Sequence, residues 1–77
     1  MNTIGITTDV IRSCNYHKTN QTLNVTTKDG FVYQYFEVPE KTINEFIETD
    51  KPGLYYANNI RKKFRRLFKT YDFSMML

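Results

Sequence analysis

Cations, aromatic rings and side-chain amides are concentrated in one stretch of the sequence, residues 51–69, which contains no acidic residue. Cations bind phosphates, aromatic faces stack on bases, and side-chain amides hydrogen-bond to base edges. We therefore predict that this stretch binds nucleic acid, with RNA as the preferred ligand. Its candidate contact residues are Lys51, Tyr55, Tyr56, Asn58, Asn59, Arg61, Lys62, Arg65 and Arg66.

The apolar residues of the same stretch recur at helical spacing. Ile60, Phe64, Leu67, Phe68 and Tyr71 stand at i, i+4, i+7, i+8 and i+11, which places them on one face of a helix. The pattern predicts a basic helix that covers a core with this face and exposes its cations. The alternative is that Lys and Arg only solvate the outside of an amphipathic helix.

The residues before this stretch are typical of strands and one further helix. Residues 10–16, 22–27 and 31–38 are rich in β-branched and aromatic residues, and a short segment around Ile4 is an optional edge strand. After Pro39, which suits the start of a helix, Ile43, Phe46 and Ile47 form an apolar helical face. We predict one α+β domain over residues 1–77: a small antiparallel sheet of three or four strands followed by two helices packed on one face.

The turn at Asp29-Gly30 decides whether two further tyrosines are exposed. A two-residue type I′ turn would pair Val25 with Gln34 and leave Tyr33 and Tyr35 on the wet face. A type I turn with a Gly bulge would pair Val25 with Tyr33 and turn both tyrosines toward the core, and we favour this register because it leaves Gln34 outside. Tyr33 and Tyr35 complete the candidate contact residues, with core packing as the favoured alternative role.

Catalytic and metal-binding patterns are weak in this sequence. Cys14 and His17 have the spacing of half a metal site, but no second pair of ligands follows, and the glycines are isolated turn residues. We therefore expect neither an enzyme, nor a metal site, nor a cofactor. A single cysteine, no signal-peptide pattern and no long apolar run favour a cytoplasmic protein without a membrane partner.

Residues spread over most of the chain resemble the KTSC domain, a short module named for the C-terminus of lysyl-tRNA synthetase. The similar positions are Tyr16, Thr22, Leu23, Val25, Gly30, Tyr33-Gln34-Tyr35, Val38-Pro39, Gly53, Tyr55-Tyr56, Asn58, Ile60 and Phe64. The resemblance covers residues 10–64 and implies a module of strands followed by two helices. RNA binding is suggested by the family's place on a tRNA ligase, but no function is established. Residues 65–77, predicted as an extension of the basic helix and an apolar tail, lie beyond it.

Two other functions stay open. An oligomer could bind a nucleotide or cyclic nucleotide messenger, as a phage sponge protein does, in a pocket built from Tyr33, Tyr35, Tyr55, Asn58 and Arg61. Alternatively, the basic helix or the apolar tail could dock on an acidic host protein. The apolar tail, residues 71–77, either docks on the core of its own chain or packs on a second copy, and we expect a homo-oligomer with a dimer as the preferred form.

Overall fold

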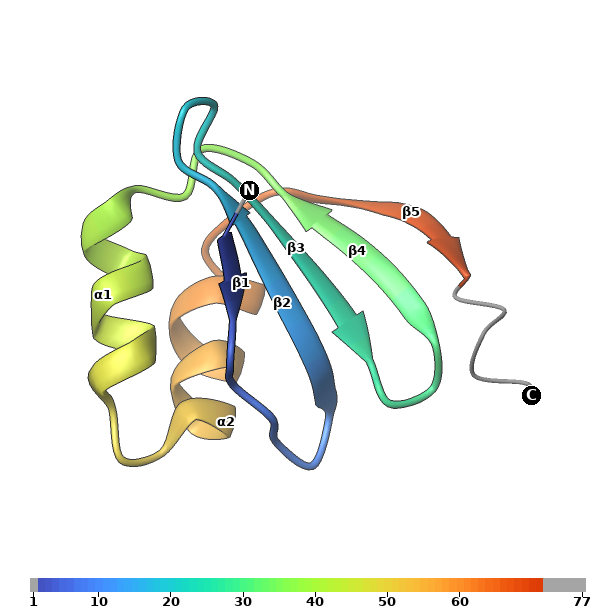
Figure 1. Cartoon of the computed structure of the whole chain (residues 1–77), viewed down its shortest axis with the longest axis horizontal. Coiled ribbons are helices and arrows are strands. Elements are labelled where there is room, and N and C mark those ends of the chain that lie inside the picture. Colours follow the sequence, from blue (N-terminus) through green and yellow to red (C-terminus); the bar gives the residue numbers. More distant parts are fainter. Residues whose placement is uncertain (1, 72–77) are drawn as a thin grey trace.

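The computed structural model describes residues 2–71, in which a five-stranded antiparallel sheet carries two helices on one face (Figure 1). In chain order the elements are β1 (Asn2–Ile4), β2 (Ile11–His17), β3 (Thr22–Thr27), β4 (Phe31–Tyr35), α1 (Glu40–Glu48), α2 (Pro52–Tyr55), the π-helix η1 (Tyr56–Arg61) and β5 (Arg66–Tyr71). The strands lie in the sheet in the order β1-β2-β3-β4-β5. Of the predicted apolar tail, Tyr71 ends β5, and residues 72–77 fall outside the described residues.

The predicted α+β class is confirmed, and so is the optional fourth strand. β1 pairs antiparallel with β2, so the segment around Ile4 does add an edge strand. Figure 1 shows α1 and α2 beside the β1 and β2 end of the sheet, whereas β4 and β5 form its opposite end. The buried core joins sheet residues to helix residues: Ile4, Ile11, Cys14, Tyr16, Leu23, Val25, Tyr35, Val38, Ile43, Phe46, Tyr56 and Ile60.

The β3–β4 hairpin adopts the favoured register. Val25 pairs with Tyr33, and the turn closes with a 3.0 Å bond from the Gly30 amide to the Thr27 carbonyl. Gly30 has a φ of 95°, the left-handed conformation that a Gly bulge requires and that other residues adopt only with strain. Tyr35 is consequently 0% exposed, while Tyr33 is half-buried against the edge of the core.

The prediction of a helix running past Phe64 is wrong. The helical segment ends at Arg61, its last turn is a π-helix, and residues 66–71 form β5 on the outer edge of β4. A short apolar run such as Leu67-Phe68 fits a strand as well as a helix, and the free hydrogen-bonding groups of β4 decide between them. Leu67 and Phe68 are therefore 57% and 51% exposed and do not close the core.

The segment between β4 and α1 is held by the sheet. The strand predicted to reach residue 38 ends at Tyr35, and Glu37 has a φ of 57°. Val38 is fully buried: its amide donates to the Gln21 carbonyl at 2.9 Å, and its carbonyl accepts from the Tyr16 hydroxyl at 2.7 Å. These bonds fix the position at which α1 begins.

Candidate nucleic-acid interface

Three aromatic rings and two arginines meet at the β4–β5 end of the helix-facing side of the sheet. We name these residues the β4–β5 patch: Phe31, Tyr33, Arg61, Arg66 and Phe68. The Phe68 ring lies edge-on to Phe31 and Tyr33, with centroids 5.9 and 5.8 Å apart. The Arg66 guanidinium lies 4.6 Å from the centre of the Tyr33 ring. The patch therefore presents flat apolar rings beside positive charge.

Strand pairing brings the patch together. Alternate residues of β4 share a face, and the pairs Tyr35 with Arg66 and Tyr33 with Phe68 bring β5 side chains to that face. A register shift between Val32 and Tyr33 adjusts this pairing. Arg61 arrives from another element, the last residue of η1. π-Helical turns are rare and occur often at functional sites.

The patch borders a cavity of about 290 Å³. The lining residues are Val10, Thr27, Asp29, Phe31, Tyr33, Tyr56, Arg61 and Arg66. Contact with the Tyr35 hydroxyl raises the pKa of Arg66, so its guanidinium stays charged at any pH at which the protein is studied. The cavity thus combines two permanent positive charges with aromatic walls and one carboxylate.

The remaining cations of the predicted stretch are exposed. Lys62 and Lys63 follow η1 directly, and Arg65 precedes β5, with its guanidinium 5.5 Å from the centre of the Phe36 ring. Lys69 is exposed on β5 itself. In the sequence, three of these exposed cations lie between Arg61 and Arg66 of the patch, and Lys69 directly follows Phe68.

Tyr35 and Tyr56, which the sequence placed among the contact residues, are core residues. Tyr35 is 0% and Tyr56 5% exposed, and their hydroxyls are hydrogen-bonded to each other at 2.5 Å. Burial, followed by this bond, raises the pKa of Tyr56. Both rings are buried, and Tyr56 packs against Tyr35 and Phe46. Neither ring therefore offers a face on which a base could stack.

Four other predicted contact residues, Lys51, Tyr55, Asn58 and Asn59, line a separate, more open hollow of about 390 Å³. Its lining residues are Thr49, Asp50, Lys51, Leu54, Tyr55, Asn58 and Asn59. One face of Tyr55 stacks on Phe46 at 5.9 Å, and its hydroxyl donates to the Glu45 carboxylate at 2.7 Å. Burial and this bond raise the pKa of Tyr55 to about 12. The structure therefore does not bring the predicted contact residues together in one site.

The candidate contact residues chosen from the sequence do not include Phe31 or Phe68, two of the three rings of the β4–β5 patch. Phe31 was recognisable, because it alternates with Tyr33 and Tyr35 along β4. Phe68 was assigned to the apolar face of a helix that does not form. Among residues 2–71 no group of three or more His, Cys, Asp and Glu side chains is placed to hold a metal ion. Cys14 is buried in the core, which raises the pKa of its thiol to about 12.

No helix within residues 2–71 is both long and apolar enough to cross a membrane.

Comparison with known proteins places the chain in a family. The crystal structure of a KTSC domain protein from Yersinia pestis is similar, with a TM-score of 0.81 and 23% sequence identity, over 90% of this chain and 97% of that one. At 23% sequence identity this similarity shows that the two chains share a fold. The comparison with curated proteins finds no match. The family model of the KTSC domain matches residues 7–64. The chain therefore belongs to the KTSC domain family.

Proposed function

We propose that this protein is a non-enzymatic module that binds single-stranded RNA through the β4–β5 patch. The observation that carries the proposal is the convergence of Arg61 and Arg66 with Phe31 and Tyr33 around one cavity. Arginine binds phosphate through a rigid fork of donors, and an exposed ring offers its face to a base. A single nucleotide offers both groups, a phosphate for an arginine and a base for a ring.

The openness of the patch favours unpaired bases. Phe31 is 39% and Phe68 51% exposed, so both rings have surface available to a ligand. Bases in a duplex are already stacked, whereas those of a single strand can turn out onto a protein ring. Lys62, Lys63 and Arg65 would then hold the phosphates that continue from the cavity. Single-stranded RNA uses both the rings and the charges.

Fluorescence anisotropy with a labelled 12-nucleotide RNA, from 50 to 300 mM salt, tests the proposal. Each phosphate contact contributes a slope of about −0.7 in log K against log salt for single strands. With about four contacts, the expected slope is roughly −3. Arg66→Ala should weaken binding about tenfold and flatten the slope by about 0.7, as expected for one lost phosphate contact with partial loss of its ring support.

Lys41→Ala is the matched control, because Lys41 is an exposed cation on α1 and lines none of these cavities. It removes one charge, as Arg66→Ala does, but should change affinity less than about twofold. No binding at 50 mM salt, or an equal loss in both variants, would contradict the proposal. Equal affinity for DNA would remove the RNA preference while leaving single-strand binding in place.

A free mononucleotide is the second candidate ligand, because the cavity of about 290 Å³ is close to the lower end of small-ligand pockets. Competition by nucleoside monophosphates for the labelled RNA distinguishes the two. Displacement at micromolar nucleotide would favour the nucleotide function, and millimolar displacement would favour RNA. A homo-oligomer, an acidic protein partner and a cytoplasmic location stay predictions.

A further inference from the structure

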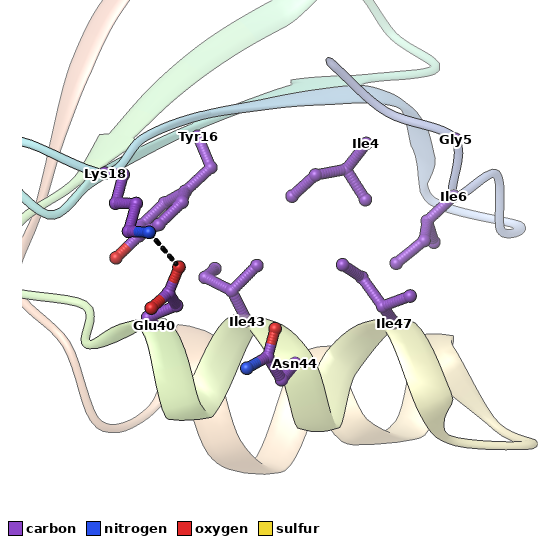
Figure 2. Close-up of a pocket in the computed structure, with 9 residues that line it drawn as sticks. All are labelled: Ile4, Gly5, Ile6, Tyr16, Lys18, Glu40, Ile43, Asn44 and Ile47. Carbon is purple, nitrogen blue, oxygen red and sulfur yellow. Dashed lines mark ion pairs between the residues drawn. The ribbon is translucent and has the colours of Figure 1, made fainter. Parts of the chain in front are cut away.

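A slot between the N-terminal segment and α1, away from the β4–β5 patch, has a volume of about 340 Å³ (Figure 2). Ile4 and Ile6 point into it from one side, and Ile43 and Ile47 face them from α1. Ile4 and Ile43 are 7% and 4% exposed, whereas Ile47 is 54% exposed and forms the open rim. The body of the slot is therefore mainly aliphatic, with Asn44 as a polar residue beside Ile43, and it is accessible from solvent.

One end of the slot is charged. The Lys18 ammonium lies 3.1 Å from a Glu40 carboxylate oxygen, beside the Tyr16 ring (Figure 2). The Tyr16 hydroxyl donates to the Val38 carbonyl, so it is engaged within the protein. Burial, together with Glu40, raises the pKa of this hydroxyl, which keeps it neutral. The polar end thus offers one cation and one anion side by side.

The two charged side chains can accept a ligand between them. The Lys18 and Glu40 side chains are 67% and 51% exposed. An ion pair this accessible adds little to stability, so separating the two side chains costs little free energy. A single anion or cation would satisfy one partner and be repelled by the other. A ligand with an ammonium and a carboxylate bonded to the same carbon would replace the one ion pair by two.

We propose that the slot binds a free α-amino acid with a branched aliphatic or aromatic side chain. Its ammonium pairs with Glu40, its carboxylate pairs with Lys18, and its side chain lies among the four isoleucines. This inference does not depend on RNA binding at the other end of the sheet. A ligand of this size, with one polar head and one small apolar group, binds with a dissociation constant on the order of 1 mM.

Methyl NMR on isoleucine-labelled protein, titrated with L-leucine to about 20 mM, tests this proposal at the expected affinity. The methyls of Ile4, Ile6, Ile43 and Ile47 should shift with saturation. Ile11 and Ile60, which are 0% exposed in the core, serve as internal references and should stay in place. Shifts of the slot methyls alone would locate the ligand.

Three control ligands separate the contributions. Isopentylamine lacks the carboxylate, 4-methylpentanoate lacks the ammonium, and glycine lacks the apolar side chain. Each should bind at least about tenfold more weakly than leucine, because each loses one contact of the order of 1.4 kcal/mol, which is a factor of ten. Equal binding of isopentylamine or 4-methylpentanoate would overturn the proposal and leave only an apolar slot.

Lys18→Gln and Glu40→Gln should each weaken leucine binding about fivefold or more, since each removes one ionic contact at an exposed position. Glu48→Gln is the matched control: it removes a carboxylate from the same helix but lines no part of the slot. Unchanged Ile11 and Ile60 signals show that a variant is folded. Absence of any leucine shift, or an equal loss in the Glu48 variant, would overturn the proposal.

Discussion

Tyr33 and Tyr35 share a face of β4, but Tyr35 is 0% exposed and Tyr33 is half-buried. Tyr35 lies where α2 and η1 cover the sheet, and its hydroxyl is hydrogen-bonded to Tyr56. Tyr33 lies one pair further along, where its ring meets Phe68 and the Arg66 guanidinium. Two residues of separation distinguish a core tyrosine from a surface one.

The comparison shows that burial under the helices, not residue type, decides whether a β4 tyrosine is a core residue. At the β4–β5 edge Phe31 and Phe68 stay 39% and 51% exposed, and the rings there pack on one another and beside the Arg66 guanidinium. Apolar surface left in the open beside charge is the usual mark of a binding site. Substitutions at the covered end should mainly lower the stability of the fold, whereas substitutions at the open end should mainly weaken ligand binding.

Two phenylalanine truncations should separate the ends most clearly. Phe46 is 0% exposed and packs on Tyr55 and Tyr56, so Phe46→Ala should lower the free energy of unfolding by about 3–5 kcal/mol. Phe68→Ala, at a ring that is 51% exposed, should cost about 1 kcal/mol. Urea denaturation followed by circular dichroism measures both. Equal losses would mean that β5 belongs to the core.

The buried tyrosine pair provides the next test. Tyr56→Phe leaves the Tyr35 hydroxyl without this partner in a covered site and should destabilise the fold by about 1–2 kcal/mol. Removing both hydroxyls should cost less than the sum of the single losses, because neither hydroxyl is left in the covered site without the other. The same denaturation experiment measures the cycle. Strict additivity would show that the two hydroxyls do not interact.

Local signals in the sequence were enough for most of the sheet. Asp29-Gly30 specified the hairpin turn, and the alternation of β3 specified which side faced the core, so the register was predictable. The break at residues 50–53 likewise separated α1 from α2. In each case the deciding interactions lie within a few residues of one another.

Long-range pairing was not predictable in the same way. Leu67 and Phe68 fit a helical stripe that begins at Ile60, and nothing nearby in the sequence indicates that β4 offers them a strand partner. Because the helix was extended to them, the open rings of the β4–β5 patch were missed. The π-turn that ends at Arg61 carries no recognised sequence signal either.

Alkaline pH should weaken the covered end. Burial raises the pKa of the Cys14 thiol from 9.0 to about 12, so the folded state holds a proton that the unfolded state releases above pH 9. This contribution is complete below pH 9 and is lost as the pH rises toward 12. Between pH 8 and 10 the stability should fall by about 1 kcal/mol. Cys14→Ala should reduce the fall in stability between pH 8 and 10, measured by urea denaturation at each pH. An unchanged fall would assign the pH dependence to other groups, such as Tyr56, whose pKa is also raised.

Arg66→Lys is the finest test of the open end. Lysine keeps the charge but lacks the planar guanidinium that lies over Tyr33, so the salt dependence of RNA binding should stay the same while affinity falls about two- to fivefold. Arg65→Lys, at a guanidinium 5.5 Å from Phe36 and outside the patch, should change affinity less. Anisotropy at 100 mM salt compares the two, and folding stability should shift by no more than about 0.5–1 kcal/mol. Equal losses at both positions would mean that charge alone holds the RNA, and that the ring beneath Arg66 has no part in binding.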